Sequence, residues 1–262
     1  MTAPCLVRPP VADAALRLVC FHHAGGAASA YRGLQEKLGP DIDVMPVQLP
    51  GREKRVRTPA VRSMDVLVDE LDAQLGPFLD GPYVLYGHSM GALIAHDLTL
   101  LRQERGSRPP ERLIAGACAA PGRAGVAGLG ALAELADREL LELMLAGGGT
   151  SAALLNHPEW MKWALGLLRN DLRLCGSRPE RPGGALLSCP VDVFAGLDDS
   201  LVPVEEAEQW ADRTTGAFRA HWFPGGHFFT RESEAAFLGR LRDVLDTVRV
   251  PVSMGAFVGG RV

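Results

Sequence analysis

The sequence predicts an α/β fold in which a mostly parallel, twisted sheet is covered by helices on both faces. Short apolar runs rich in β-branched and aromatic residues alternate along the chain with segments of helical period. One of these runs, residues 83–86, leads into Gly-His-Ser-Met-Gly at residues 87–91 and then into a helix-forming segment. A strand, a tight turn and a helix in this order also indicate where a reactive serine lies.

Length and composition fit a globular protein with one large α/β domain or two small ones. The chain has 262 residues, of which 47% are hydrophobic and 22% charged, and its formal net charge is −4. This charge creates no basic field that would attract nucleic acid or a membrane, and no apolar run reaches the ~18 residues of a membrane-spanning helix. The N-terminus lacks the apolar core of a signal peptide. We therefore expect a cytoplasmic protein without nucleic-acid or membrane partners.

The five cysteines are odd in number and include no Cys-x-x-Cys pair. This pattern argues against a disulfide framework or a zinc site. Cys20 and Cys118 lie in apolar, strand-like runs, so we expect them to be small buried residues. A cysteine nucleophile has no local signature here, and no metal or organic cofactor is implied.

Strands and helices alternate in the first half of the chain. The predicted strands cover residues 16–21, 42–48 and 83–86, and the predicted helices cover residues 29–38, 63–79 and 90–104. In the helix over 63–79, apolar residues recur at Met64, Leu67 and Leu71, with Ser63 as the expected N-cap. A further strand is predicted over residues 112–118.

The alternation stops between residues 121 and 184. A Leu-rich helix is predicted over residues 132–145, and an apolar stripe at helical spacing begins with Trp160 and Trp163. Core packing alone would explain the stripe. However, the block lies between two strand runs and is bounded by Gly- and Pro-rich stretches. We therefore predict a helical lid inserted over the C-terminal edge of the sheet, with an apolar substrate chamber beneath it.

The sheet resumes after this block. Strands are predicted over residues 191–195 and 217–223, and a closing helix over residues 232–248. The predicted organisation is an α/β core of residues 1–120 and 185–250, a helical lid insertion of residues 121–184 and a tail of residues 251–262. The tail fits either a disordered end or a docking segment.

Ser89 is the predicted nucleophile. It lies at the centre of Gly-x-Ser-x-Gly, between the predicted strand and helix. A side chain at Gly87 or Gly91 would collide with the neighbouring strand or helix. The turn also places the amide of Met90 at a helix N-terminus, where partial positive charge favours an anion. The alternative interpretation, that Ser89 is only a helix N-cap, does not account for the flanking strand.

A Gly-rich segment, residues 22–29, follows the first predicted strand. It has neither G-x-G-x-x-G nor the P-loop lysine, so phosphate binding is disfavoured. In a fold with a nucleophile elbow, this loop instead lends a backbone N–H to the oxyanion hole, and Ala24 is the candidate donor beside Met90. His22 and His23 are expected to hold the loop shape through side-chain hydrogen bonds.

An acid and a histidine complete the predicted site. Asp199 follows one late strand and His227 follows the next, so the chain order is Ser, Asp, His, which is the order of α/β-hydrolases. Ser89 would attack a carbonyl, His227 would accept and return the proton, and the aspartate would hold the imidazole. Asp198 is the alternative acid, but the spacing to the Val-Pro that follows favours Asp199.

Several motifs together resemble those of type II thioesterases, the stand-alone editing hydrolases of polyketide and nonribosomal peptide pathways. They are Phe-His-His-Ala-Gly-Gly at 21–26, Leu-Pro-Gly-Arg-Glu at 49–53, Gly-His-Ser-Met-Gly-Ala at 87–92, Gly-Leu-Asp-Asp at 196–199 and Pro-Gly-Gly-His-Phe at 224–228. The resemblance covers residues 16–248. It implies that the substrate is an acyl group on the phosphopantetheine arm of an acyl or peptidyl carrier protein.

The resemblance also suggests a docking surface. Carrier proteins of this family's pathways are acidic, and the basic cluster from Arg52 to Arg62 is the most basic stretch of this chain. A solvated surface is the default interpretation of such a cluster. We expect a monomer that hydrolyses carrier-bound thioesters. The alternatives are an esterase or lipase for small oxygen esters, a carrier-protein module that only binds an acyl chain, and an acyltransferase.

Overall fold

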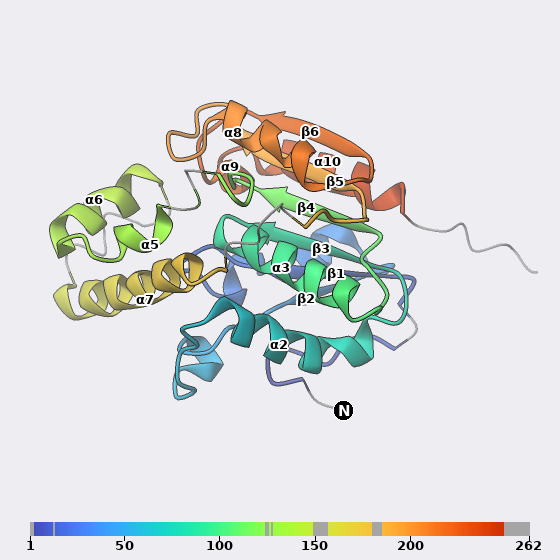
Figure 1. The fold of residues 1–262 in the computed structure, drawn as a ribbon, viewed down its shortest axis with the longest axis horizontal. Helices are drawn as coiled ribbons and strands as arrows, with labels where there is room; N and C mark the ends of the chain where they lie inside the picture. Colours follow the sequence, from blue (N-terminus) through green and yellow to red (C-terminus); the bar gives the residue numbers. More distant parts are fainter. Residues whose placement is uncertain are drawn as a thin grey trace, which may run out of the picture.

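The computed structural model describes residues 3–12, 14–123, 126, 128–148, 157–179 and 185–248. A six-stranded sheet with the order β2-β1-β3-β4-β5-β6 forms its centre, and all neighbouring strands in it are parallel (Figure 1). The strands are β1 (Leu16–Phe21), β2 (Ile42–Pro46), β3 (Tyr83–His88), β4 (Arg112–Gly116), β5 (Val191–Gly196) and β6 (Phe218–Phe223). The predicted parallel α/β architecture is therefore confirmed.

The strand order reverses next to β1. From β1 the chain moves to β2 on one side and then returns to β3 on the other side. In open parallel sheets, ligands bind beyond the carboxyl ends of the strands at such a switch point. The loops that follow β1 and β3 therefore meet where a site is expected.

Helices cover both faces of the sheet, as predicted. One face packs against α2 (Met64–Leu75), α3 (Met90–Glu104), α8 (Val204–Glu208) and the 3-10 helix η5 (Gln209–Arg213). The other face packs against α1 (Leu34–Leu38), α9 (Phe229–Glu232) and α10 (Glu234–Asp246). The alternation of strand side chains supplies both cores: Val19 and Leu85 face the first, whereas Leu18 and Val84 face the second.

Two predicted helices are broken in the structure. The helix expected over residues 29–38 is a 3-10 helix, η1 (Ala28–Tyr31), followed by the short α1, because Gly33 between them has a φ of 78°. The helix expected over residues 132–145 is two helices, α5 (Leu129–Leu132) and α6 (Asp137–Ala146). The second begins where the Glu139 carboxylate accepts the Ala136 N–H at 2.9 Å.

The helix expected over residues 63–79 is α2, which a 3-10 turn, η3 (Gly76–Phe78), follows. Ser63 occupies the predicted N-cap position of α2, but its side chain makes no capping hydrogen bond. The Met64 N–H instead donates to the Ser177 hydroxyl at 2.9 Å. A residue 113 positions later in the chain thus caps α2, which local sequence patterns do not reveal.

In the described residues between β4 and β5, the part of the chain predicted as an insertion, the structure has three helices. They are α5, α6 and α7 (Pro158–Gly176), and Figure 1 shows them grouped to one side of the sheet. They share a small core that includes Leu140, Leu165 and Leu172. The predicted apolar stripe is split: Leu168 is buried, whereas Trp160 is 66% exposed and Trp163 is 54% exposed.

The predicted tail, residues 251–262, and residues 149–156 and 180–184 of the insertion lie outside the described residues. Within the described part of the chain, every helix is too short or too polar to cross a bilayer.

Candidate active site

Ser89 lies in a strained turn between β3 and α3. Its φ is 55° and its ψ is −118°, a backbone conformation that side chains rarely adopt. The turn needs both flanking glycines: a Cβ at Gly87 would lie 2.1 Å from the Gly91 carbonyl oxygen, and one at Gly91 would lie 2.0 Å from the Phe21 carbonyl oxygen. The Ser89 N–H donates to the Gly116 carbonyl at 2.7 Å, which fixes the turn to β4.

His227 and Asp199 meet beyond the ends of β5 and β6. The His227 Nδ1 lies 2.8 Å from the Asp199 Oδ2. The second carboxylate oxygen of Asp199 accepts the N–H groups of Leu201 and Val202 at 2.8 and 3.1 Å, and the side chain is completely buried. This network holds a carboxylate behind the imidazole ring and leaves the other ring nitrogen free to exchange a proton with a hydroxyl.

Asp198, the alternative acid, makes a different contact. It is exposed, and its carboxylate accepts the Gly225 N–H at 3.4 Å. The structure thus pairs Asp199, rather than Asp198, with the histidine.

His88, the residue before the serine, contacts the backbone of His227. Its Nε2 lies 2.9 Å from the His227 carbonyl oxygen, and its Nδ1 lies 3.4 Å from the Tyr86 hydroxyl. Burial, followed by the neighbouring His227, lowers the pKa of His88 well below its usual value, so the ring is neutral. Because a carbonyl only accepts, Nε2 carries the proton and donates to His227. His88 therefore fixes the loop on which His227 lies.

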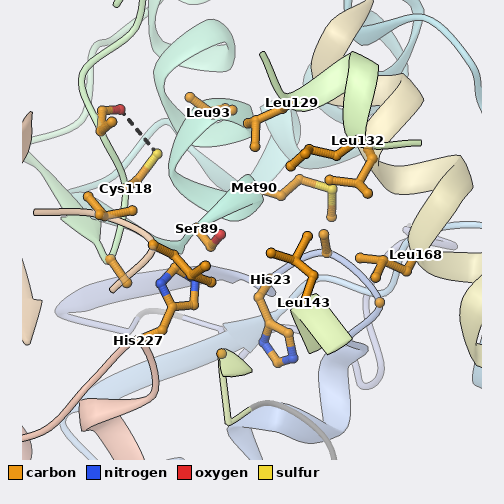
Figure 2. A pocket seen from close by; sticks show the side chains of 18 of the residues that line it. His23, Ser89, Met90, Leu93, Cys118, Leu129, Leu132, Leu143, Leu168 and His227 are labelled. Atoms are coloured by element: carbon orange, nitrogen blue, oxygen red, sulfur yellow. Dashed lines mark hydrogen bonds between the residues drawn. The ribbon is translucent and has the colours of Figure 1, made fainter. Parts of the chain in front are cut away.

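An apolar cavity of about 250 Å³ opens next to Ser89 and His227. Figure 2 shows the Ser89 hydroxyl and the His227 ring at one end of it. Helices of the insertion supply much of the remaining wall through Leu129, Leu132, Leu143, Met144, Leu168 and Leu172. Such a lining binds an apolar chain by burying it and leaves the polar groups at the serine to orient the reacting carbonyl.

Ala24 and Met90 both line this cavity. Among the described residues, neither backbone N–H has a hydrogen-bond acceptor. Met90 is the first residue of α3, where the helix dipole favours negative charge. Two amides that face a cavity beside a serine can hold the oxygen of a tetrahedral intermediate.

The two loop histidines behave differently from each other. His22 donates from Nδ1 to the His23 carbonyl at 2.8 Å, so it holds the loop shape as predicted. The His23 ring instead packs edge-on against Phe228, with centroids 4.8 Å apart, and lines the cavity. Burial is the main cause that lowers the pKa of both rings to about 3, so both are neutral.

Sequence reasoning missed a buried ion pair beside the cavity. Arg52 makes two hydrogen bonds of 2.7 Å to Asp171 on α7, and the two side chains are 2% and 0% exposed. The prediction that Arg52 belongs to a docking surface was wrong, because it is buried in this pair. Lys54, Arg57 and Arg62 of the same cluster are exposed. One signal in the sequence indicates a buried partner: Asp171 lies three residues after Leu168, so this charged side chain is on the apolar face of α7.

The described part of the chain has no group of three or more His, Cys, Asp or Glu side chains that could hold a metal ion. All five cysteines are buried and unpaired. Cys118 lines the cavity, but burial raises the pKa of its thiol to about 12. The thiol is therefore protonated, which leaves Ser89 as the better nucleophile.

Comparisons with known proteins agree on one family. A family model described as a thioesterase domain matches residues 16–245. A probable cadicidin biosynthesis thioesterase of Streptomyces griseus is 40% identical over 223 residues, which are 84% of this chain but only 60% of that protein. Thioesterase PikA5 of Streptomyces venezuelae is 33% identical over 85% of this chain and 78% of its own length.

Solved structures agree with these matches. The type II thioesterase BorB from the borrelidin biosynthetic cluster superposes with a TM-score of 0.80 at 33% identity and covers 94% of this chain and 99% of its own. RedJ, a thioesterase from the prodiginine pathway of Streptomyces coelicolor, also gives a TM-score of 0.80, at 36% identity, over 93% of this chain and 95% of its own.

Proposed function

The chain belongs to the thioesterase family, and we propose that it is a stand-alone, type II member that hydrolyses acyl thioesters on the phosphopantetheine arm of acyl or peptidyl carrier proteins. It removes aberrant or stalled acyl groups during polyketide or nonribosomal peptide biosynthesis, in the cytoplasm and as a monomer. The observation that carries this proposal is the apolar cavity that Ser89 and His227 line together with Ala24 and Met90, whose N–H groups have no acceptor among the described residues. Relatives such as BorB support the type II assignment.

The residues divide the chemistry between them. Ser89 Oγ attacks the thioester carbonyl while His227 Nε2 takes its proton, and the N–H groups of Ala24 and Met90 stabilise the oxyanion. Asp199 holds the tautomer and stabilises the charged imidazole. The C–S bond then breaks, and His227 protonates the departing thiolate. Water, activated by the same ring, hydrolyses the acyl-enzyme and releases a free acid.

A thioester suits this site because its thiolate leaving group needs little protonation by an acid to depart. A thiol has a pKa of ~8.5, far below that of an alcohol, so it departs readily as a thiolate. The cavity then has to supply only an apolar surface for the acyl chain and hydrogen bonds for the oxyanion. An esterase with the same triad must protonate a poorer leaving group.

The first test compares substrates. Hydrolysis of an acyl-carrier thioester should exceed that of the matched oxygen ester in kcat/KM by at least about tenfold. The reverse preference would favour the esterase. Binding of the acylated carrier without turnover of either substrate would favour a binding module, and turnover only when an alcohol or amine is added would favour an acyltransferase.

The exposed remainder of the basic cluster supports docking of an acidic carrier. Arg57 and Arg62 are exposed on the loop that precedes α2, where they can contact carboxylates. The double variant Arg57→Glu with Arg62→Glu should raise KM for the carrier-bound substrate and leave kcat/KM for a small soluble thioester unchanged. Arg240→Glu, at an exposed site on α10, is the matched control. Equal KM values in all three proteins would remove this docking assignment.

A further inference from the structure

An ion pair from outside the loop holds the turn that carries Ala24. Residues 23–26 form a tight turn in which the Gly26 N–H donates to the His23 carbonyl at 3.0 Å. Gly25 occupies the third position with a φ of 73°, which favours glycine. Its N–H donates to the Asp171 Oδ2 at 2.7 Å, while the Gly26 carbonyl accepts from the Arg52 Nη1 at 3.0 Å. The turn is therefore held on both sides by the same pair.

The pair itself is built as a rigid unit. Both carboxylate oxygens of Asp171 accept from the two terminal nitrogens of Arg52, which is the fork geometry that guanidinium groups favour. The Arg52 Nε donates to the Pro50 carbonyl at 3.2 Å. Every charged atom of the pair is thus hydrogen-bonded, and water does not reach it.

We propose that Arg52 and Asp171 are positioning residues that orient the Ala24 N–H toward the reacting carbonyl, an inference that rests on the proposed thioesterase function. Asp171 draws the Gly25 N–H toward α7, and this fixes the plane of the Ala24–Gly25 peptide. Among the described residues the neighbouring Ala24 N–H has no acceptor, and Ala24 lines the cavity. A helix of the insertion thereby sets the geometry of an oxyanion donor that the sheet core carries.

A purely structural role is the competing explanation, and the chain offers a matched control for it. Arg178, just after α7, makes two hydrogen bonds of 2.6 Å to Asp97 on α3, and both side chains are largely buried. This second pair also fastens the end of α7 to the core. In contrast to the first pair, Arg178 makes its hydrogen bonds to Asp97 and His96 on α3, away from the turn at residues 23–26.

The test replaces each pair with apolar side chains, because removing both charges leaves no unpaired buried ion. The variants are Arg52→Met with Asp171→Leu, and Arg178→Met with Asp97→Leu. The measurements are kcat and KM for an acyl thioester of N-acetylcysteamine, the inhibition constant of an alkylboronic acid, and the thermal unfolding midpoint. Ser89 Oγ adds to the boron and the serine proton passes to His227. The boron becomes tetrahedral and presents one of its oxygens to the oxyanion donors.

The Arg52/Asp171 double variant should lose about 10- to 100-fold in kcat with KM within about twofold, since removing one oxyanion donor costs about 10²–10³. Its boronic acid affinity should fall by a similar factor. The Arg178/Asp97 variant should keep both values. Equal losses in the two variants, or no loss in the first, would overturn the proposal.

Two further outcomes keep the test decisive. If the Arg52/Asp171 double variant does not fold, the Arg52→Lys variant takes its place. Lysine keeps the positive charge but cannot make the two parallel hydrogen bonds to Asp171, so kcat should fall about three- to tenfold at unchanged KM. An unchanged kcat in Arg52→Lys would count against the proposal. If the wild type fails to hydrolyse any thioester yet still binds the boronic acid, the proposed function fails, and the boronic acid affinities alone decide whether the pair positions the donor.

Discussion

The two sides of the cavity are built in different ways. On the sheet side, Ser89, Asp199 and His227 are held by strand ends, a strained turn and directional hydrogen bonds. On the insertion side, leucines of α5, α6 and α7 line the wall with side chains that make no directional bonds. The difference indicates that the sheet specifies the chemistry and the insertion specifies which acyl chain fits. Changes on the sheet side should abolish turnover, whereas changes on the insertion side should alter which acyl chains are hydrolysed.

The largest effect should come from Ser89→Ala. Without its nucleophile, the protein should lose up to ~10⁶ in kcat, the loss measured for a serine nucleophile in subtilisin. The thermal unfolding midpoint should stay close to that of the wild type, because alanine removes a single oxygen. The comparison is made by initial rates on a small thioester together with a melting curve. Residual activity near that of the wild type would remove Ser89 from the mechanism.

Asp199→Asn should have the next largest effect. An asparagine keeps the shape but favours the wrong imidazole tautomer, which costs about 10⁴ in kcat for the corresponding aspartate of a serine protease. Asp198→Asn serves as the control, because this exposed carboxylate accepts from the Gly225 N–H and the change should alter kcat less than about threefold. A larger loss at Asp198 than at Asp199 would reverse the assignment of the acid.

Stability should fall in acid because of the buried histidines on the sheet side. Burial is the main cause that lowers the pKa of His22 and His23 to about 3 and that of His88 well below its usual value. Below pH ~6.5 these histidine rings bind protons in the unfolded chain but stay neutral in the folded protein. The free energy of unfolding should therefore be fully retained above this pH and fall by about 1.4 kcal/mol per pH unit for each histidine below it.

Urea unfolding at several pH values between about 7.5 and 5 measures this slope. His22→Asn should make the slope shallower by about the contribution of one histidine. His157→Asn, at an exposed position in the insertion, should leave it unchanged. A free energy of unfolding that is constant over this range would show that the folded protein protonates these rings as readily as the unfolded chain.

Leu143→Phe should change the choice of substrate rather than the chemistry. The larger ring reduces the cavity from the side of α6, so kcat/KM for the longest acyl chains should fall about 10- to 200-fold while short chains are spared. A series of saturated acyl thioesters of increasing length gives the profile. Leu145→Phe, on the same helix, is the control. A uniform loss over all chain lengths would show that the insertion side also affects the chemistry.

The smallest effect should come from the outer face of α7. Trp160 and Trp163 are mostly exposed, and Trp160 stacks on His157 with centroids 5.0 Å apart. Replacing both with serine should change the free energy of unfolding by no more than about 0.5 kcal/mol per residue and leave small-thioester turnover intact. Chemical denaturation and initial rates measure both quantities. A large loss of stability would show that these rings belong to a packed core.

Local signals explain which features could be predicted from the sequence. The tight turn at Ser89 requires glycine two residues before and two residues after the serine. A short sequence motif therefore contains everything that the turn needs. The parallel sheet follows from apolar strand runs, whose residues are buried in β3 and β5. The spacing to the following Val-Pro favours Asp199, and the hydrogen bonds of its carboxylate with Leu201 and Val202 are also local.

The features that could not be predicted depend on distant partners. Arg52 and Asp171 are 119 positions apart, and Arg52 stands in a charged run that is typical of a surface. Ser63 has the chemistry of an N-cap, yet Ser177 makes the bond because the fold brings α7 to the start of α2. The break between α5 and α6 depends on a capping carboxylate at Glu139 that competes with a Leu-rich helical pattern.

The most direct measurement is intact-mass spectrometry of an acyl-loaded carrier protein after incubation with the protein, with Ser89→Ala as the control. With the wild type only, the carrier should lose the mass of its acyl group and free acid should appear. A carrier that keeps its acyl group with the wild type, while the same protein rapidly cleaves a small oxygen ester, would show that the cavity serves oxygen esters and not carrier-bound thioesters.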